Sequence, residues 1–144
     1  MKIIGTRFTG KNKYGDFEWM CNQELYSDSL FIFNDNEEYH ETCKQGLGNA
    51  VIRKYNKYNK KLLKPRSAGI PTGTLKFKGY NSLTPRVKKI IDSSINEIRD
   101  LLDKYEYDNI YYSVGTNGKL GMSLFVVAED VIDYIDSQIN KLVD

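Results

Sequence analysis

SLFIFNDN, at Ser29–Asn36, is the stretch that decides the fold. A short continuous run of aromatic and β-branched residues is typical of a strand that is buried on both faces in a parallel sheet. The run changes abruptly to Asn34, Asp35 and Asn36, where the strand should end. In α/β proteins, ligands bind in the crevice beyond the carboxyl ends of such strands. These three polar residues are therefore the candidate catalytic residues.

The stretch GLGNAVIR, at Gly46–Arg53, places a glycine-containing turn after this strand. We expect Asn49 to cap a short helix that runs to about Tyr55. The first amides of a helix and the positive end of its dipole suit an anion such as phosphate. The alternative is a flexible turn with an Asn cap and no ligand. The candidate ligand-binding residues here are Gly46, Gly48, Asn49 and Arg53.

Strands and helices alternate along the chain beyond these two stretches. SAGIP at Ser67–Pro71 and NIYYSV at Asn109–Val114 are predicted to be interior strands. A long amphipathic helix should begin after Thr84, with Pro85 at the first helical position. Another amphipathic helix is expected from about Glu129. This alternation predicts an α/β fold, with a mixed or mostly parallel sheet flanked by helices.

Right-handed crossovers should bring the loops after Phe33, Pro71 and Val114 to one edge of that sheet. The last of these loops is GTNGKLG at Gly115–Gly121. Its glycines permit positive φ and a close approach of backbone amides to a diphosphate. The loop matches neither the Walker motif nor the G-x-G-x-x-G fingerprint, and a plain turn is the alternative. The candidate ligand-binding residues here are Gly115, Thr116, Asn117, Gly118, Lys119 and Gly121.

The opening of the chain, residues 1–28, is irregular and punctuated by glycines. We expect Lys2–Gly5 and Phe17–Cys21 to be short strands there, with the core in residues 29–142. A chain of 144 residues is predicted to form a single domain, 1–144. A domain of that size buries roughly 70% of its unfolded surface.

The composition excludes a protein that attracts polyanions through a large net charge. The net charge is +2, from 21 basic and 19 acidic residues, so no global field attracts polyanions. The apolar stretch near the N-terminus is too short for a signal peptide, and no segment has the length of a membrane span. Cys21 and Cys43 do not form a C-x-x-C pair. We therefore expect a cytoplasmic protein with no membrane partner.

A metal site is not expected. His40 and Cys43 have an H-x-x-C spacing beside several glutamates, but zinc needs about four ligands and no second cluster supplies the rest. A lone histidine on an acidic loop is most often exposed. The sequence therefore predicts neither a metal nor a cofactor.

The segment 54–64 has the composition of a surface that binds single-stranded nucleic acid, because lysines for phosphates alternate with aromatic faces for bases. A solvated connection whose tyrosines pack on the domain is the favoured interpretation at this net charge. The residues concerned are Lys54, Tyr55, Lys57, Tyr58, Lys60, Lys61 and Lys64.

The order FIFNDN, GLGNAVI, SAGIPTG, a long helix, YYSVGTNGKLGM and a terminal helix resembles two families. One is a set of small uncharacterised bacterial and viral domains with an LFxFxDN, GIPT and late glycine-loop pattern, over roughly Ser29–Leu142. The other is the macrodomain, whose V-N-A-A-N strand end and glycine loops bind ADP-ribose. The chain departs from macrodomains in having only Gly46 and Gly48 at the first loop, and Asp35 in place of a small residue.

The macrodomain resemblance implies that Asn34 and Asn36 lie beside a ribose, while the Gly46 and Gly115–Gly121 loops hold the diphosphate. The implied function is binding of ADP-ribose or a related nucleotide. An ADP-ribosyl hydrolase would in addition use Asn34, Asp35 or Asn36 to position a water molecule. Two alternatives stay open: a nucleic-acid module that uses segment 54–64, and an interaction scaffold without a ligand site.

Overall fold

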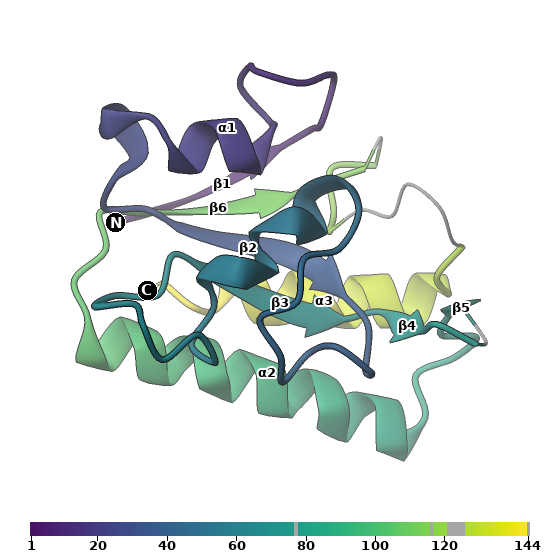
Figure 1. The fold of residues 1–144 in the computed structure, drawn as a ribbon. Coiled ribbons are helices and arrows are strands. Elements are labelled where there is room, and N and C mark those ends of the chain that lie inside the picture. Colours follow the sequence, from purple (N-terminus) through teal and green to yellow (C-terminus); the bar gives the residue numbers. More distant parts are fainter. Residues whose placement is uncertain (77, 116, 121–125, 144) are drawn as a thin grey trace.

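The computed structural model describes residues 1–76, 78–115, 117–120 and 126–143 (Figure 1). It has an α/β fold in which a four-stranded parallel sheet lies between helices, in one compact domain. The strand order is β1-β6-β2-β3. The strands are β1 (Lys2–Thr6), β2 (Leu30–Asp35), β3 (Ser67–Pro71) and β6 (Asn109–Ser113).

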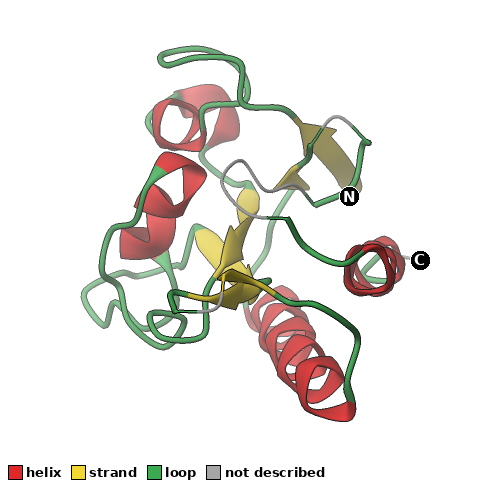
Figure 2. Cartoon of the chain, turned by 90° about the vertical axis from the view of Figure 1, so that its right-hand side faces the viewer, coloured by secondary structure: helices red, strands yellow, loops and turns green. Residues whose placement is uncertain are grey.

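Helices cover both faces of the sheet (Figure 2). One face packs against α2 (Pro85–Lys104) and α3 (Glu129–Asn140). The other face packs against α1 (Phe17–Cys21) and the 3₁₀ helix η2 (Gly48–Tyr55). A short 3₁₀ turn, η1 (Glu24–Tyr26), follows α1.

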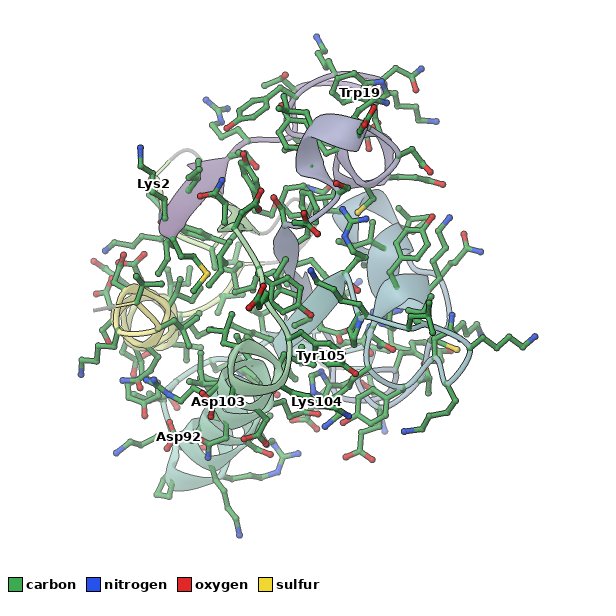
Figure 3. The ribbon with its side chains drawn as sticks, turned by 90° about the vertical axis from the view of Figure 1, so that its left-hand side faces the viewer. Lys2, Trp19, Asp92, Asp103, Lys104 and Tyr105 are labelled. Atoms are coloured by element: carbon green, nitrogen blue, oxygen red, sulfur yellow. The ribbon has the colours of Figure 1, made fainter. Side chains whose placement is uncertain are left out.

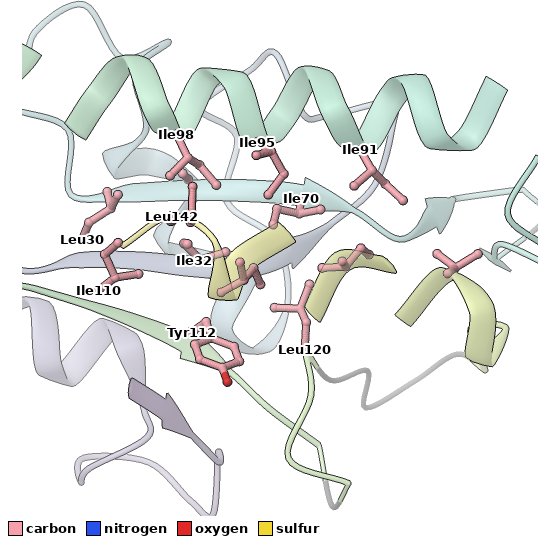
Figure 4. Packing of buried hydrophobic residues seen from close by; sticks show 14 of the residues in the cluster. Leu30, Ile32, Ile70, Ile91, Ile95, Ile98, Ile110, Tyr112, Leu120 and Leu142 are labelled. Carbon is pink, nitrogen blue, oxygen red and sulfur yellow. The ribbon is translucent and has the colours of Figure 1, made fainter. Parts of the chain in front are cut away.

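Strand β2 is buried on both faces, as its apolar run predicts. Leu30 and Ile32 join the core under α2 and α3, whereas Phe31 and Phe33 join the smaller core under α1 and η2. Figure 4 shows Leu30 and Ile32 together with Ile95 and other isoleucines of α2. Each such buried side chain stabilises the fold by roughly 1.5–3 kcal/mol relative to an exposed one.

Helix α2 begins where the sequence indicates. The Thr84 side chain accepts a hydrogen bond from the backbone N–H of Val87 at 3.1 Å, and Pro85 occupies the first turn. The helix buries an apolar stripe against the sheet: Val87, Ile91, Ile95, Ile98 and Leu101. The predictions of this helix, of α3, and of strands β2, β3 and β6 are confirmed.

The parallel register aligns the carboxyl ends of the strands. Thr6 of β1 pairs with Ser113 of β6, and Asp35 of β2 pairs with Pro71 of β3. The loops that follow the strands therefore leave from one edge, as expected. Beyond β3 lies a small antiparallel ribbon of β4 (Gly73–Thr74) and β5 (Lys78–Gly79).

Two local predictions are wrong. Phe17–Cys21 is a helix and not a strand, because the Asp16 side chain caps it by accepting a hydrogen bond from the N–H of Trp19. Asn49 does not cap η2, whose N-cap is Leu47. The Asn49 side chain is instead buried and forms hydrogen bonds with residues that are distant in sequence. The residues next to Asn49 in the sequence give no sign of these partners.

Candidate functional site

The three polar residues at the end of β2 do not converge on one point. Neighbouring residues of a strand point to opposite faces, so Asn34 lies on the α2 face and Asp35 on the η2 face. The Asn36 side chain accepts a hydrogen bond from the N–H of Tyr39 at 2.9 Å and thereby shapes the turn after the strand. The strand end therefore provides a turn and a buried carboxylate.

Asp35 forms a buried ion pair with Arg53 of η2. The carboxylate oxygen Oδ1 accepts from Arg53 Nε at 3.0 Å and from Nη2 at 2.5 Å. The two side chains are only 1% and 2% exposed. A Cβ at Gly69 of β3 would lie 2.3 Å from Asp35 Oδ2, so the absence of a side chain there makes room for the carboxylate. Arg53 is therefore buried and paired inside the protein.

His40 extends this pair into a row of alternating charges. Its Nδ1 lies 3.1 Å from Asp35 Oδ2, and its Nε2 lies 2.5 Å from Oε1 of Glu97 on α2. Burial acts to lower the pKa of His40, but the hydrogen bonds with Asp35 and Glu97 outweigh it and raise the pKa to about 9. The expectation of an exposed histidine is wrong, since the side chain is 14% exposed.

Glu97 ends this row, which we call the buried charge row: Arg53, Asp35, His40 and Glu97. Tyr58 donates a hydrogen bond to Glu97 Oε2, and Lys57 Nζ lies 3.6 Å from the same oxygen. Burial opposes ionisation of Glu97, but the hydrogen bonds from His40 and Tyr58 lower its pKa below the usual value. Both carboxylates are therefore matched by cations on either side.

An open hollow of about 570 Å³ lies beside His40 and Glu97, between the turn after β2 and helix α2. Ser94 Oγ on its wall is 3.5 Å from His40 Nε2, which resembles the spacing of a nucleophile and a base. However, a histidine with a pKa of about 9 is protonated at neutral pH and cannot accept a proton. Ser94 donates instead to the carbonyl of Ile90. His40 Nε2 is also much closer to Glu97 Oε1, at 2.5 Å, than to Ser94 Oγ, so the geometry favours the ion pair with Glu97.

A second hollow, of about 460 Å³, lies where the chain enters η2, and we call it the Gly46 hollow. Gly46 and Gly48 line it together with Lys11, and Trp19 of α1 forms part of its apolar wall. Trp19 lies on the opposite side of the molecule from α2 (Figure 3). The remaining lining residues are Phe8, Asn12, Asp16, Glu18, Asn22, Leu47 and Val51.

Two carboxylates of the Gly46 hollow are already engaged. Asp16 Oδ2 accepts a hydrogen bond from the N–H of Asn12 at 2.8 Å and so closes the loop before α1. Glu18 pairs with Lys54 Nζ at 2.9 Å. The Lys54 ammonium therefore offsets the charge of Glu18, whereas Asp16 keeps its negative charge, and Lys11 is a cation among the lining residues.

Asn49 of η2 connects this helix to the N-terminal segment. Its Oδ1 accepts from the N–H of Phe17 at 3.0 Å, and its Nδ2 donates to the Gly15 carbonyl and to Ser113 Oγ at 3.2 and 3.1 Å. Gly46 uses its own amide in a 3.1 Å hydrogen bond to the Ala50 carbonyl. These groups therefore stabilise the segment that lines the hollow.

The described residues of the late glycine loop, 115 and 117–120, form hydrogen bonds with one another. The amide of Gly115 donates to the Lys119 carbonyl at 2.9 Å, and the amide of Gly118 donates to the Gly115 carbonyl at 3.1 Å. Asn117 Oδ1 accepts from the Lys119 amide, while Lys119 Nζ lies 2.5 Å from Asp133 of α3. The candidates Thr116 and Gly121 lie outside the described residues.

Several lysines of segment 54–64 have acidic partners. Lys54 pairs with Glu18, Lys57 with Glu97, and Lys64 with Asp28 at 3.3 Å. The Tyr58 hydroxyl is committed to Glu97. These contacts lower the charge that this segment presents to a phosphate backbone.

Comparison with protein-family models, with curated proteins and with solved structures found no match. In the part of the chain that the structure describes, no group of three or more His, Cys, Asp or Glu residues is arranged to hold a metal ion. Cys21 and Cys43 are free thiols. None of the described helices combines the length and apolar character that a bilayer crossing requires.

Proposed function

We propose that this chain binds ADP-ribose or a related nucleotide in the Gly46 hollow. The observation that carries the proposal is the hollow itself, which lies beside the two glycines of the candidate phosphate loop. Its volume of about 460 Å³ falls within the range of small-molecule sites, roughly 300–1,000 Å³. The macrodomain resemblance of the sequence, which stays a prediction, favours the same class of ligand.

The chemistry of the hollow suits a ligand with an aromatic base and a charged phosphate. Trp19 and Phe8, the latter 45% exposed, offer ring faces on which a base can stack. Lys11 offers a cation. In the first turn of η2 the Ala50 N–H already donates to the Leu47 carbonyl, so the candidate amides for an anion are those of Gly48 and Asn49.

Binding without cleavage is the form of the proposal that these residues support best. A hydrolase needs a group that can position or deprotonate water. Both oxygens of Asp35 already have partners, and Asn36 is committed to its turn. We therefore propose a protein that recognises or sequesters a nucleotide.

A thermal-shift panel tests the proposal, because a ligand that binds only the folded state raises the Tm by mass action. The panel contains ADP-ribose, ADP, ribose 5-phosphate and a single-stranded oligonucleotide. We expect ADP-ribose or ADP to raise the Tm in a concentration-dependent manner. A flat response to both nucleotides would overturn the proposal, whereas a shift only with the oligonucleotide would favour the nucleic-acid module.

A charge reversal then locates the site. We expect Lys11→Glu to weaken ADP-ribose binding by about tenfold, because it replaces an attraction to phosphate with a repulsion. Lys60→Glu is the matched control, since Lys60 is an exposed lysine that does not line the hollow. Equal affinities of the two variants would place the ligand elsewhere.

A further inference from the structure

Arg53 contacts the segment that forms the Gly46 hollow. Its Nη1 donates a 2.9 Å hydrogen bond to the carbonyl of Lys44, two residues before Gly46. A Cβ at Gly46 would lie 3.0 Å from the same nitrogen, so the backbone of this glycine packs directly against the guanidinium. The position of residues 44–46 therefore depends on where the Arg53 side chain is held.

The guanidinium is held by the rest of the buried charge row. Its other two nitrogens donate to Asp35 Oδ1, while Asp35 Oδ2 is tied to His40. The rings of Phe33 and Tyr39 lie 5.8 and 5.6 Å from the guanidinium carbon and limit its movement further. His40 in turn is anchored to Glu97, which belongs to the long helix on the opposite side of the sheet.

We propose that Arg53 is a positioning residue for the ligand site, and that the buried charge row couples Glu97 on α2 to the shape of the Gly46 hollow. The coupling of the loop stands on contacts within the protein. Its consequence for ligand affinity rests on the proposed function. The proposal assigns Arg53 an indirect role, in place of the direct contact with an anion that its position in the sequence indicates.

Glu97→Gln tests this coupling from its far end, where the substitution removes one charge from a half-buried side chain. Asp103→Asn is the matched control, because it removes the same charge from the exposed surface of the same helix (Figure 3). The first measurement is hydrogen exchange of the Gly46 and Ala50 amides, which are hydrogen-bonded within the segment. We expect Glu97→Gln to accelerate their exchange by about 2- to 30-fold, the range for coupling through a packed network, and Asp103→Asn to leave it unchanged.

The second measurement is the Kd for ADP-ribose of both variants at a temperature where each is folded. We expect Glu97→Gln to weaken binding by a similar factor, although Glu97 does not line the Gly46 hollow. Arg53→Lys should weaken it as well, since one ammonium group cannot reproduce the fork that joins Asp35 to the Lys44 carbonyl.

The outcomes separate the two proposals. Unchanged exchange of the Gly46 and Ala50 amides in folded Glu97→Gln would overturn the coupling, even where ADP-ribose binds. Accelerated exchange in a protein that binds no nucleotide would support the coupling and overturn the proposed function. Equal acceleration by Asp103→Asn would mean that α2 is merely destabilised as a whole, which also contradicts the coupling.

Discussion

His40 links the stability of the protein to pH. Its pKa is about 9 in the folded protein, against an ordinary value of 6.5. Because folding raises this pKa, the stabilising contribution is fully present below pH 6.5 and is lost as the pH rises through 9. A rise of this size corresponds to about 3 kcal/mol.

We therefore expect His40→Gln to lower the free energy of unfolding by about 3 kcal/mol near pH 6. Near pH 10 the two proteins should differ much less, because the histidine is then neutral in both the folded and unfolded states. Denaturant titrations of the protein and the variant at both pH values check this. A difference that does not change with pH would show that His40 acts only through packing.

The pair Asp35 and Arg53 should respond asymmetrically to single and double substitution. Arg53→Met leaves a buried carboxylate with one partner fewer, and we expect a loss of about 3–5 kcal/mol. Asp35→Leu should be similarly costly. The double variant should lose less than the sum of the two, as a double-mutant cycle from denaturant titrations would reveal. Additive losses would mean that the two side chains do not interact.

At the scale of elements, η2 depends on Asn49 for its attachment to the N-terminal segment. Asn49→Ala removes hydrogen bonds to Phe17, Gly15 and Ser113, and it leaves buried polar groups unpaired. We expect a loss of about 1–3 kcal/mol in the free energy of unfolding.

The same variant distinguishes a structural Asn49 from a ligand-binding one. A structural residue predicts a lower Tm with little change in ADP-ribose affinity at a temperature where the variant is folded. Thermal unfolding and calorimetric titration of the one variant provide both values. A large loss of affinity without a loss of Tm would favour a direct contact.

Most elements could be predicted because their signals are local. The apolar run of β2, the Thr84 and Pro85 start of α2, and the spacing of its apolar residues all lie within a few positions. The strand expected at Phe17–Cys21 is a helix, because the Asp16 side chain caps it. The secondary structure of a short amphipathic segment depends on its capping residue and on the core against which it packs. Only the capping residue can be recognised in the sequence.

The candidate site was less predictable, because its contacts join residues that are distant in sequence. His40 and Glu97 are 57 positions apart, and nothing near His40 indicates that a carboxylate of α2 reaches it. The sequence places Arg53 beside the candidate phosphate loop, and only the register of β2 shows that Asp35 lies beneath η2 and binds it. Arg53 is 2% exposed, and no local pattern around it in the sequence indicates this burial.

At the scale of the whole molecule, two apolar cores share one sheet. Trp19 packs against the core under α1 and η2, whereas the long helices α2 and α3 cover the other core. Because both faces of β2 are buried, we expect the two cores to unfold together. Trp19 is the single tryptophan of the chain, so its fluorescence reports on the smaller core. Fluorescence and far-ultraviolet circular dichroism should give coincident transitions in denaturant. Two separate midpoints would show that the smaller core unfolds independently.

The bare backbone at Gly69 has a consequence for anyone who engineers this protein. Replacing a glycine inside a strand is a routine way to increase thermostability, and Gly69 of β3 is such a glycine. Here even alanine would intrude on the Asp35 carboxylate and push it away from both of its cationic neighbours. An attempt to stiffen the edge of the sheet would therefore dismantle its polar interior.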